Sequence, residues 1–237
     1  MNILAIGNSF SQDATRYLQA IARSQGEKWN VVNLYIGGCS LEQHYRNMLR
    51  ENEAYGLQIN GNLSGFYVSL KEALLNRPWD VITLQQASHY SAFYHTYQPY
   101  LNELVAYVRK LCPKAKVYIH QTWAYEAGSQ KLESVSFPTP EAMFAEVEKA
   151  YAQAAADICA DGIIPSGKLM LQLSEHTTVH RDTFHASLGI GRLALGLLWY
   201  TTLSGQRIAD CTFRDTDEPV DEALVATAIA LVESLTM

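Results

Sequence analysis

The chain has 237 residues, of which 48% are hydrophobic and 18% are charged, and its formal net charge is −6. This length and composition are typical of one folded domain spanning 1–237 and exclude intrinsic disorder. The acidic balance, the absence of a Lys/Arg cluster and the lack of an apolar stretch of 18 residues argue against nucleic acid and membrane as partners.

Short apolar runs and segments with helical spacing alternate along the chain. The first run ends at Gly7-Asn8 and the second at Gly37-Gly38, which are typical turn sequences. Segment 45–69 is polar and less regular, and we expect a helix and an excursion there. The apolar runs predict strands at 2–6, 30–36, 79–84, 116–120 and 162–165. Helical spacing predicts helices at 14–21, 99–111, 140–159, 187–203 and 219–235.

The alternation of strands and helices predicts an α/β fold. Each parallel pair of strands needs a crossover, so we expect a three-layer α/β/α sandwich around a mostly parallel sheet of roughly five strands. Unusual polar residues follow the predicted strands: Ser9 the first, Gln85 and Gln86 the third, and Gln121 the fourth. Because ligands bind at the carboxyl ends of strands in open α/β sheets, these residues indicate a site.

The cysteines and the first residues bear on the expected compartment. Cys39, Cys112, Cys159 and Cys211 are widely spaced and form no C-x-x-C pair, so neither a structural zinc site nor a disulfide framework is indicated. We interpret them as buried thiols in a reducing compartment. The first strand is expected to begin at Asn2, without the basic segment and long apolar core of a secretory signal. We therefore expect a cytoplasmic protein, unless a signal peptide has been trimmed.

The sequence Gly7-Asn-Ser-Phe-Ser11 occupies the turn between the first strand and the first helix. Such a turn exposes a side chain to the ligand crevice and directs helix N-terminal amides at it, which favours developing negative charge. Ser9 is therefore a candidate nucleophile. The alternative is that Ser9 or Ser11 only caps the helix, which is the commoner role for serine in this position.

A serine nucleophile needs a base, and a carboxylate that orients the base. Asp182 and His185 lie three residues apart at a turn that enters a predicted helix. Asp182 could accept a hydrogen bond from one ring nitrogen of His185 while the other nitrogen faces Ser9. An isolated Asp-x-x-His is more often structural, because acidic residues before helices are common caps. The catalytic interpretation depends on the occurrence of this motif together with the Ser9 block.

These blocks together resemble the SGNH/GDSL hydrolase superfamily. The resemblance runs from Ile3-Leu-Ala-Ile-Gly-Asn-Ser-Phe-Ser11 through Asn33-Leu-Tyr-Ile-Gly-Gly-Cys-Ser40 to Asp182-Thr-Phe-His185. More narrowly, the sequence resembles the branch of the superfamily that has a Gly-Asn-Ser-Phe-Ser block. That branch is largely described as a domain of unknown function. The resemblance implies a flavodoxin-like SGNH hydrolase fold and a triad of Ser9, Asp182 and His185. It also implies an oxyanion hole that includes the amides of Ser9 and Gly38.

One block departs from the superfamily pattern. The superfamily has Gly-x-Asn-Asp after the third strand, and the Asn amide completes the oxyanion hole, whereas this chain has Leu84-Gln-Gln-Ala-Ser88. A glutamine carries the same amide donor on a longer arm, so Gln85 or Gln86 could replace the Asn, and Gln85 is slightly favoured because it directly follows the strand. The alternative is that both glutamines bond to neighbouring loop backbone.

Two further groups of residues invite a binding role. His89, Tyr90 and Trp123 belong to polar and aromatic segments after strands and would suit a sugar-like ligand, although core packing is an equal alternative for any one aromatic. A zinc site made from His176, His180 and His185 is the weaker alternative, because no H-E-x-x-H is present. We expect neither a metal nor a cofactor.

The sequence therefore predicts a metal-independent serine esterase that acts on a small O-acyl ester, with an acetyl group on a carbohydrate favoured. The substrate is expected to be a small-molecule or saccharide ester. A lipase, thioesterase or acyltransferase with the same triad remains an alternative. So does a carbohydrate-binding relative that has lost turnover, because of the altered third block.

Overall fold

The computed structural model describes residues 1–236, and the strands in this part of the chain are β1 (Asn2–Gly7), β2 (Asn30–Tyr35), β3 (Tyr55–Ile59), β4 (Asn62–Val68), β5 (Val81–Leu84), β6 (Lys116–His120) and β7 (Gly162–Ile164). They form one sheet in the order β4-β3-β2-β1-β5-β6-β7. Strands β2, β1, β5, β6 and β7 are parallel, and β3 and β4 join one edge as an antiparallel hairpin. β1 is therefore the central strand.

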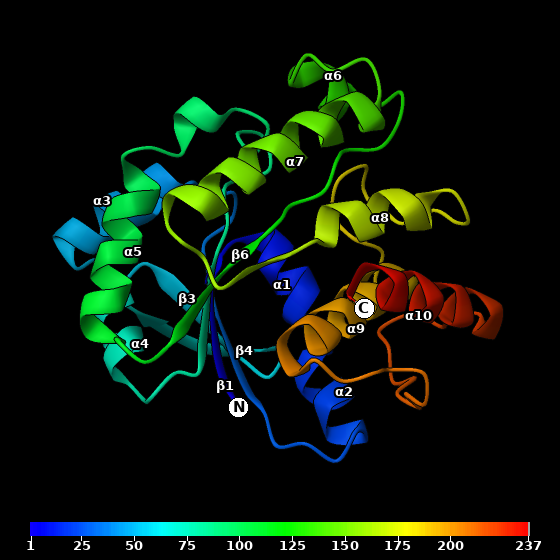
Figure 1. Ribbon diagram of the computed structural model, residues 1–237, viewed down its shortest axis with the longest axis horizontal. Helices are drawn as coiled ribbons and strands as arrows, with labels where there is room; N and C mark the ends of the chain where they lie inside the picture. The colour runs from blue at the N-terminus through cyan, green and yellow to red at the C-terminus, as the bar shows by residue number, and fades with distance from the viewer. Residues whose placement is uncertain (237) are drawn as a thin grey trace.

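Helices cover both faces of this sheet (Figure 1). Within residues 1–236 they are α1 (Ser9–Thr15), α2 (Leu18–Ser24), α3 (Leu41–Arg50), α4 (Leu70–Leu75), a 3-10 turn η1 (Tyr94–Thr96), α5 (Tyr100–Leu111), α6 (Gln130–Ser134), α7 (Pro140–Asp157), α8 (Ser166–Ser174), α9 (Ile190–Ser204) and α10 (Glu222–Thr236). Helices α3, α4 and α5 pack together on one side, and α1, α2, α9 and α10 pack on the other. This confirms the predicted α/β/α sandwich.

The five predicted strands are the five parallel strands of the sheet. Most of their residues are apolar and buried because helices cover both faces, and a run such as Val81–Leu84 is buried throughout. The estimate of roughly five strands is too low, since the hairpin β3–β4 adds two. Helices α4, α6 and α8 also lie outside the predicted ranges.

The hairpin β3–β4 lies in segment 45–69, where α3 accounts for the expected helix. Most of β4 is exposed, so its residues lack the apolar alternation that reveals a half-buried strand. Its sequence signal is the turn Asn60-Gly61, in which both residues have positive φ, 51° and 81°. A Cβ at Gly61 would lie 2.1 Å from the Arg16 carbonyl oxygen, so only glycine fits there.

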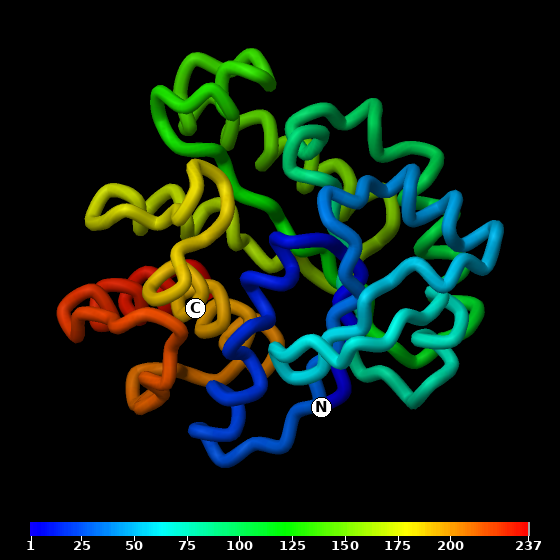
Figure 2. The backbone as a smooth tube through the Cα atoms, turned by 180° about the vertical axis from the view of Figure 1, so that it is seen from behind, coloured from blue at the N-terminus to red at the C-terminus, as the bar shows by residue number. Residues whose placement is uncertain are grey.

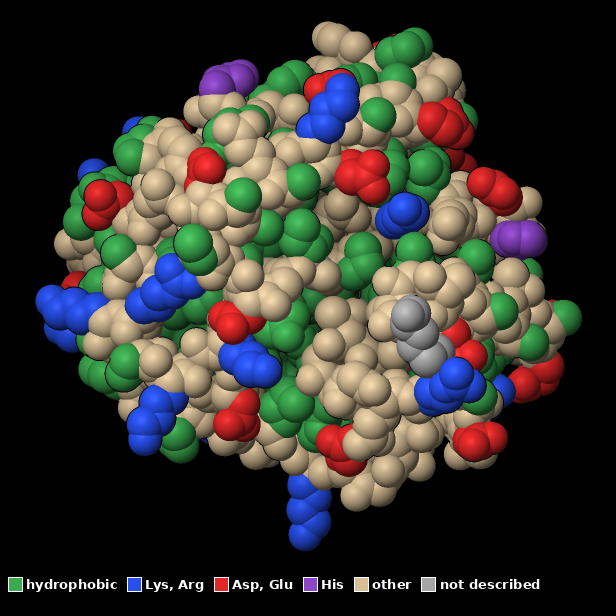
Figure 3. Space-filling model, in the orientation of Figure 1, with side chains coloured by type: hydrophobic (Ala, Val, Ile, Leu, Met, Phe, Trp, Pro, Cys, Tyr) green, Lys and Arg blue, Asp and Glu red, His purple; other side chains and the backbone are tan. Residues whose placement is uncertain are grey.

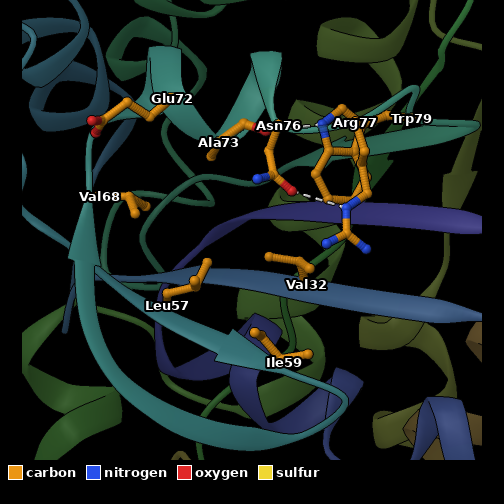
Figure 4. A pocket seen from close by; sticks show the side chains of 9 residues that line it. All are labelled: Val32, Leu57, Ile59, Val68, Glu72, Ala73, Asn76, Arg77 and Trp79. Atoms are coloured by element: carbon orange, nitrogen blue, oxygen red, sulfur yellow. Dashed lines mark hydrogen bonds between the residues drawn. The ribbon is translucent and has the colours of Figure 1, made fainter.

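A cavity of about 240 Å³ lies between this hairpin, β2 and α4 (Figure 4). Its lining is mostly apolar and includes Val32, Leu57 and Trp79. Trp79 precedes β5, whereas Ser9, Gln85 and the other predicted site residues follow the carboxyl ends of their strands. None of those residues lines this cavity, so it is separate from the candidate site.

The distribution of surface charge agrees with the absence of a Lys/Arg cluster in the sequence. Basic and acidic side chains are interspersed over the face seen in Figure 3, and neither sign forms a broad patch there. No helix within residues 1–236 is long and apolar enough to cross a membrane. Of the cysteines, Cys39, Cys112 and Cys211 are buried free thiols, but Cys159 is exposed, which corrects the expectation that all four are buried.

Candidate active site

Ser9 is the first residue of α1 and directly follows the turn that ends the central strand. Asn8 has an extended backbone and caps the helix, because its Oδ1 accepts a 3.0 Å hydrogen bond from the Phe10 amide. Ser9 is therefore free of the capping role that was the alternative interpretation. It is also partly exposed, whereas Asn8, Phe10 and Ser11 are buried.

The predicted helix at 14–21 is wrong in its bounds, since α1 begins at Ser9 and a break separates it from α2.

The structure brings Ser9, His185 and Asp182 together. His185 Nε2 lies 2.8 Å from Ser9 Oγ, and His185 Nδ1 lies 2.7 Å from Asp182 Oδ2. The His185 backbone amide also donates to Asp182 Oδ1 at 2.9 Å, so both carboxylate oxygens hold the histidine. In Figure 2 the loop that precedes α9 runs beside the turn that follows β1.

The charge of Asp182 favours one tautomer of the His185 ring. Partial burial tends to raise the pKa of Asp182, but the hydrogen bonds from His185 outweigh burial and hold this pKa below its ordinary value. An ionised Asp182 accepts from Nδ1–H, so the neutral ring presents Nε2 as an acceptor to the Ser9 hydroxyl. This is the arrangement in which a histidine can remove a proton from a serine.

A buried ion-pair cluster joins α1 to the loop that carries Asp182 and His185. Asp13 is fully buried, and its Oδ1 accepts from Arg181 Nη1 at 2.9 Å and from Arg192 Nε at 2.8 Å. Its Oδ2 accepts from the Ala186 amide at 3.1 Å. Arg181 and Ala186 flank the Asp182–His185 turn, so Asp13 ties that turn to the helix that begins with Ser9. Sequence reasoning missed this cluster.

Trp123 also supports the Asp182–His185 turn. Its ring stacks on Phe10 with centroids 4.0 Å apart, and its Nε1 donates to the Phe184 carbonyl oxygen at 2.7 Å. The prediction that Trp123 contacts the substrate is wrong, because the side chain is fully buried. The core-packing alternative applies, and Trp123 holds the residue that precedes His185.

The predicted oxyanion donor Gly38 lies in an exposed turn that is hydrogen-bonded to Asn8, the residue before Ser9. Gly38 has a φ of 62°, which favours glycine. Asn8 Nδ2 donates to the Cys39 carbonyl oxygen at 3.1 Å, which fixes the Gly37–Cys39 turn to the residue before Ser9. The role of the Gly38 amide stays a prediction.

The two glutamines after β5 are buried and hydrogen-bonded within the protein. Gln86 Oε1 accepts from the Leu41 and Ala87 amides, and its Nε2 lies 3.0 and 3.1 Å from the Thr96 carbonyl and hydroxyl oxygens. Both amide hydrogens of Gln86 thus have acceptors, which corrects the prediction that Gln86 serves the oxyanion hole. For Gln86 the bonding alternative applies.

Gln85 is linked directly to the nucleophile turn. Its Nε2 donates to Asn8 Oδ1 at 2.8 Å, and its Oε1 accepts from His120 Nδ1 at 2.7 Å. Burial lowers the pKa of His120 to about 3, so the ring is neutral, and its Nε2 accepts from Ser166 Oγ at 3.1 Å. Gln85 has one amide hydrogen beyond its bond to Asn8, and its oxyanion role stays a prediction.

His89 and Tyr90 line a second, open cavity of about 750 Å³, formed by segments 89–96 and 131–136. Phe184 connects this cavity to His185, because Lys131 Nζ lies 4.7 Å from the Phe184 ring centroid and the Phe184 and His185 rings lie 3.9 Å apart. Within residues 1–236 no group of three or more His, Cys, Asp or Glu side chains is placed to hold a metal ion. The histidine-cluster alternative therefore has no site in this part of the chain.

Comparison with solved structures defines the class of protein. The chain is 25% identical to a candidate SGNH hydrolase from Slackia heliotrinireducens, with a TM-score of 0.62 over 86% of this chain and 98% of that one. It shares its fold with a lipase/acylhydrolase from Enterococcus faecalis at 15% identity, with a TM-score of 0.59 over 86% and 95% of the two chains. The fold is that of the SGNH hydrolases, as the sequence blocks indicate.

A match to a family model identifies the chain more specifically than its fold does. The family DUF4886, described as a domain of unknown function, matches residues 2–232, and the chain belongs to it. A DUF4886 family protein from Bacteroides uniformis is 30% identical, with a TM-score of 0.91 over 99% of this chain and 93% of that one. No curated protein matches the chain.

Proposed function

We propose that this protein is a serine hydrolase that cleaves a small O-acyl ester, with an acetyl group on a carbohydrate favoured. The observation that carries the proposal is the continuous hydrogen-bonded chain from Ser9 Oγ through the His185 ring to Asp182, at 2.8 and 2.7 Å. The SGNH hydrolase fold of its structural neighbours supports the same class of reaction.

In the proposed reaction, Ser9 Oγ attacks the ester carbonyl carbon while His185 Nε2 accepts the hydroxyl proton. Asp182 stabilises the resulting imidazolium. The carbonyl oxygen becomes an oxyanion that the Ser9 and Gly38 amides, with the Gln85 side chain, stabilise. His185 then returns the proton to the leaving alcohol, and a water molecule activated by the same histidine hydrolyses the acyl-enzyme. Each step uses groups that this chain supplies.

The lining of the open cavity favours a hydroxylated alcohol portion over a lipid. Its side chains combine histidine, serine and threonine with the apolar faces of Tyr90, Phe93 and Val135, a mixture that suits a sugar with hydroxyl groups and apolar ring faces. The mostly apolar cavity lies elsewhere, under the β3–β4 hairpin. We therefore favour a sugar ester over the lipase alternative.

The first prediction is that Ser9→Ala lowers kcat for a chromogenic acetyl ester by at least about a thousandfold, because it removes the attacking oxygen. The fold, measured by circular dichroism, should be unchanged. A serine-directed phosphonate should label Ser9 in the wild-type protein. Ser174→Ala, at an exposed serine on α8, is the matched control and should keep full activity.

Two outcomes would contradict the proposal. Full activity in Ser9→Ala, or labelling of a different serine, would remove Ser9 as the nucleophile. A wild-type protein that binds acetylated sugars but hydrolyses neither them nor the chromogenic ester would favour the non-catalytic alternative.

A further inference from the structure

The cavity beside the triad has an unusual charge for this chain. Its lining includes Lys131, His89 and His95, and no Asp or Glu among the described residues lines it. The chain as a whole has an excess of acidic residues, 24 against 18 Lys and Arg. A cavity lined by Lys and His but by no Asp or Glu of the described residues therefore does not reflect the general composition.

Lys131 is held in place without an anionic partner. It forms no ion pair within residues 1–236, and its ammonium lies over two rings, 4.7 Å from the Phe184 centroid and 5.7 Å from the Tyr125 centroid. Cation–π contacts of this kind orient an ammonium but leave its hydrogen-bond donors available. The side chain is thus a fixed positive charge with donors free for a ligand.

The position of Lys131 connects it to the proposed chemistry. The Phe184 ring contacts both groups, with the Lys131 ammonium 4.7 Å and the His185 ring 3.9 Å from its centroid, so one aromatic ring links a lining residue of the cavity to the proposed base. His89 also lines the cavity, and its pKa is lowered, first by burial and then by the positive charge of Lys131. A neutral His89 beside a charged Lys131 can hydrogen-bond a ligand without adding a second full charge.

The cavity also offers apolar faces. Tyr90 is 42% exposed, and Phe93 lines the same wall. Aromatic faces of this kind pack against the apolar face of a sugar ring. An acetyl group carries no charge, so an anionic group that reaches Lys131 must belong to the alcohol portion of the ester.

We propose that the cavity formed by segments 89–96 and 131–136 is a subsite for a carboxylate on the alcohol portion of the substrate, and that the substrate is an acylated acidic saccharide such as a uronic acid. This inference rests on the proposed function and narrows its substrate. Lys131 pairs with the carboxylate, and Tyr90 and Phe93 contact the sugar ring.

The test compares two ligands that differ in one group, acetylated methyl glucuronoside and acetylated methyl glucoside. Binding is measured by calorimetry on Ser9→Ala, which lacks the proposed nucleophile and leaves the esters intact. We expect the glucuronoside to bind about tenfold more tightly, the effect of one partly shielded ion pair. High salt should reduce this preference, because it screens the pair.

Replacement of the lysine should abolish the preference. In the Ser9→Ala background, Lys131→Met should weaken binding of the glucuronoside by about tenfold and leave the glucoside unchanged. Lys131→Arg should keep the preference. Lys110→Met, at an exposed lysine on α5, makes the same change in net charge and should alter neither affinity.

The inference fails if the two ligands bind equally, or if Lys131→Met weakens both to the same extent. These binding results do not depend on turnover. Hydrolysis of both esters by the wild type, with KM following the same order as Kd, tests the proposed function separately. A preference in binding without hydrolysis would retain the subsite and reject the esterase.

Discussion

The two glutamines that follow β5 have the same side chain but different surroundings. Gln85 bonds to Asn8, the residue before the proposed nucleophile, whereas Gln86 bonds to the Leu41 amide and to Thr96. Gln85 is therefore the glutamine that we propose as an oxyanion donor. Gln86 links the start of α3 to the loop after β5, which is a structural role.

This difference gives a prediction for a pair of matched variants. Gln85→Ala should lower kcat for an acetyl ester by about a hundredfold with little change in KM, because an oxyanion donor acts only in the transition state. Gln86→Ala should instead lower the free energy of unfolding, by about 1–3 kcal/mol, because it leaves buried partners unpaired. Steady-state kinetics and urea unfolding on both variants measure the two effects.

The prediction is wrong if Gln85→Ala keeps near-wild-type kcat. The oxyanion would then be held by backbone amides alone. A large loss of kcat in Gln86→Ala at full stability would reverse the two assignments.

At the scale of elements, α1, α9 and the Asp182–His185 turn meet at the Asp13 carboxylate. Asp13 is fully buried between two arginines, and Asp217 pairs with Arg16 and Arg192 closer to the surface. The hydrogen bond from Arg16 lowers the pKa of Asp217 to about 2, against a smaller opposing effect of burial. The cluster thus contains one buried and one partly exposed carboxylate.

The two carboxylates should respond differently to neutral replacement. Asp13→Asn removes the fully buried carboxylate that pairs with Arg181 and Arg192, leaves Arg181 without an ion-pair partner within residues 1–236 and should lower the free energy of unfolding by about 3 kcal/mol. It should also lower kcat, because the His185 turn loses its attachment to α1. Asp217→Asn should cost at most about 1 kcal/mol, as expected for exposed pairs. Urea unfolding measures the loss of unfolding free energy in each variant, and ester kinetics measure the loss of kcat. Equal losses of unfolding free energy in the two variants would show that burial of the carboxylate does not determine this loss.

A feature can be predicted from the sequence when its signal lies in residues that are neighbours along the chain. Ser9, Asp182 and His185 lie in short blocks at the ends of elements, so their neighbours in the chain reveal them. The Asp13–Arg181 pair joins residues 168 positions apart, and no local pattern encodes such a contact. Its available signal was a charged residue, Asp13, among the apolar positions of a buried helix face.

The other differences between the sequence-based predictions and the structure also have physical causes. An aromatic residue after a strand can face the crevice or the core, and the sequence of Trp123 does not distinguish the two. Similarly, the amide of Gln86 finds acceptors in η1, which sequence does not place beside it. The β3–β4 hairpin escaped detection because its edge strand is exposed and carries no apolar alternation.

At the scale of the whole molecule, two fully buried histidines, His44 and His120, and the half-buried His180 are neutral. Burial lowers the pKa of His44 and His120 to about 3 and that of His180 to about 4, from an ordinary value of 6.5. In the unfolded chain these rings bind protons below about pH 6.5, whereas the folded protein does not. The unfolded state then binds more protons, so stability falls as the pH drops from about 6.5 toward 4.

The free energy of unfolding should therefore decrease by several kcal/mol between pH 7 and pH 4, on the order expected from proton linkage. Urea titrations at several pH values measure this slope. His44→Gln should make the slope shallower, because one buried ring is removed, whatever its effect on stability at pH 7. An identical slope in His44→Gln and the wild type would contradict the assignment.

The placement of the triad along the chain has a consequence for synthesis on the ribosome. Ser9 follows the first strand, but its partners Asp182 and His185 come from a turn just before α9. A nascent chain that has not reached residue 182 carries the proposed nucleophile without its base and is chemically inert. Esterase activity would therefore appear only during the last quarter of translation, when α9 docks against α1, and it would report that the two ends of the chain have met.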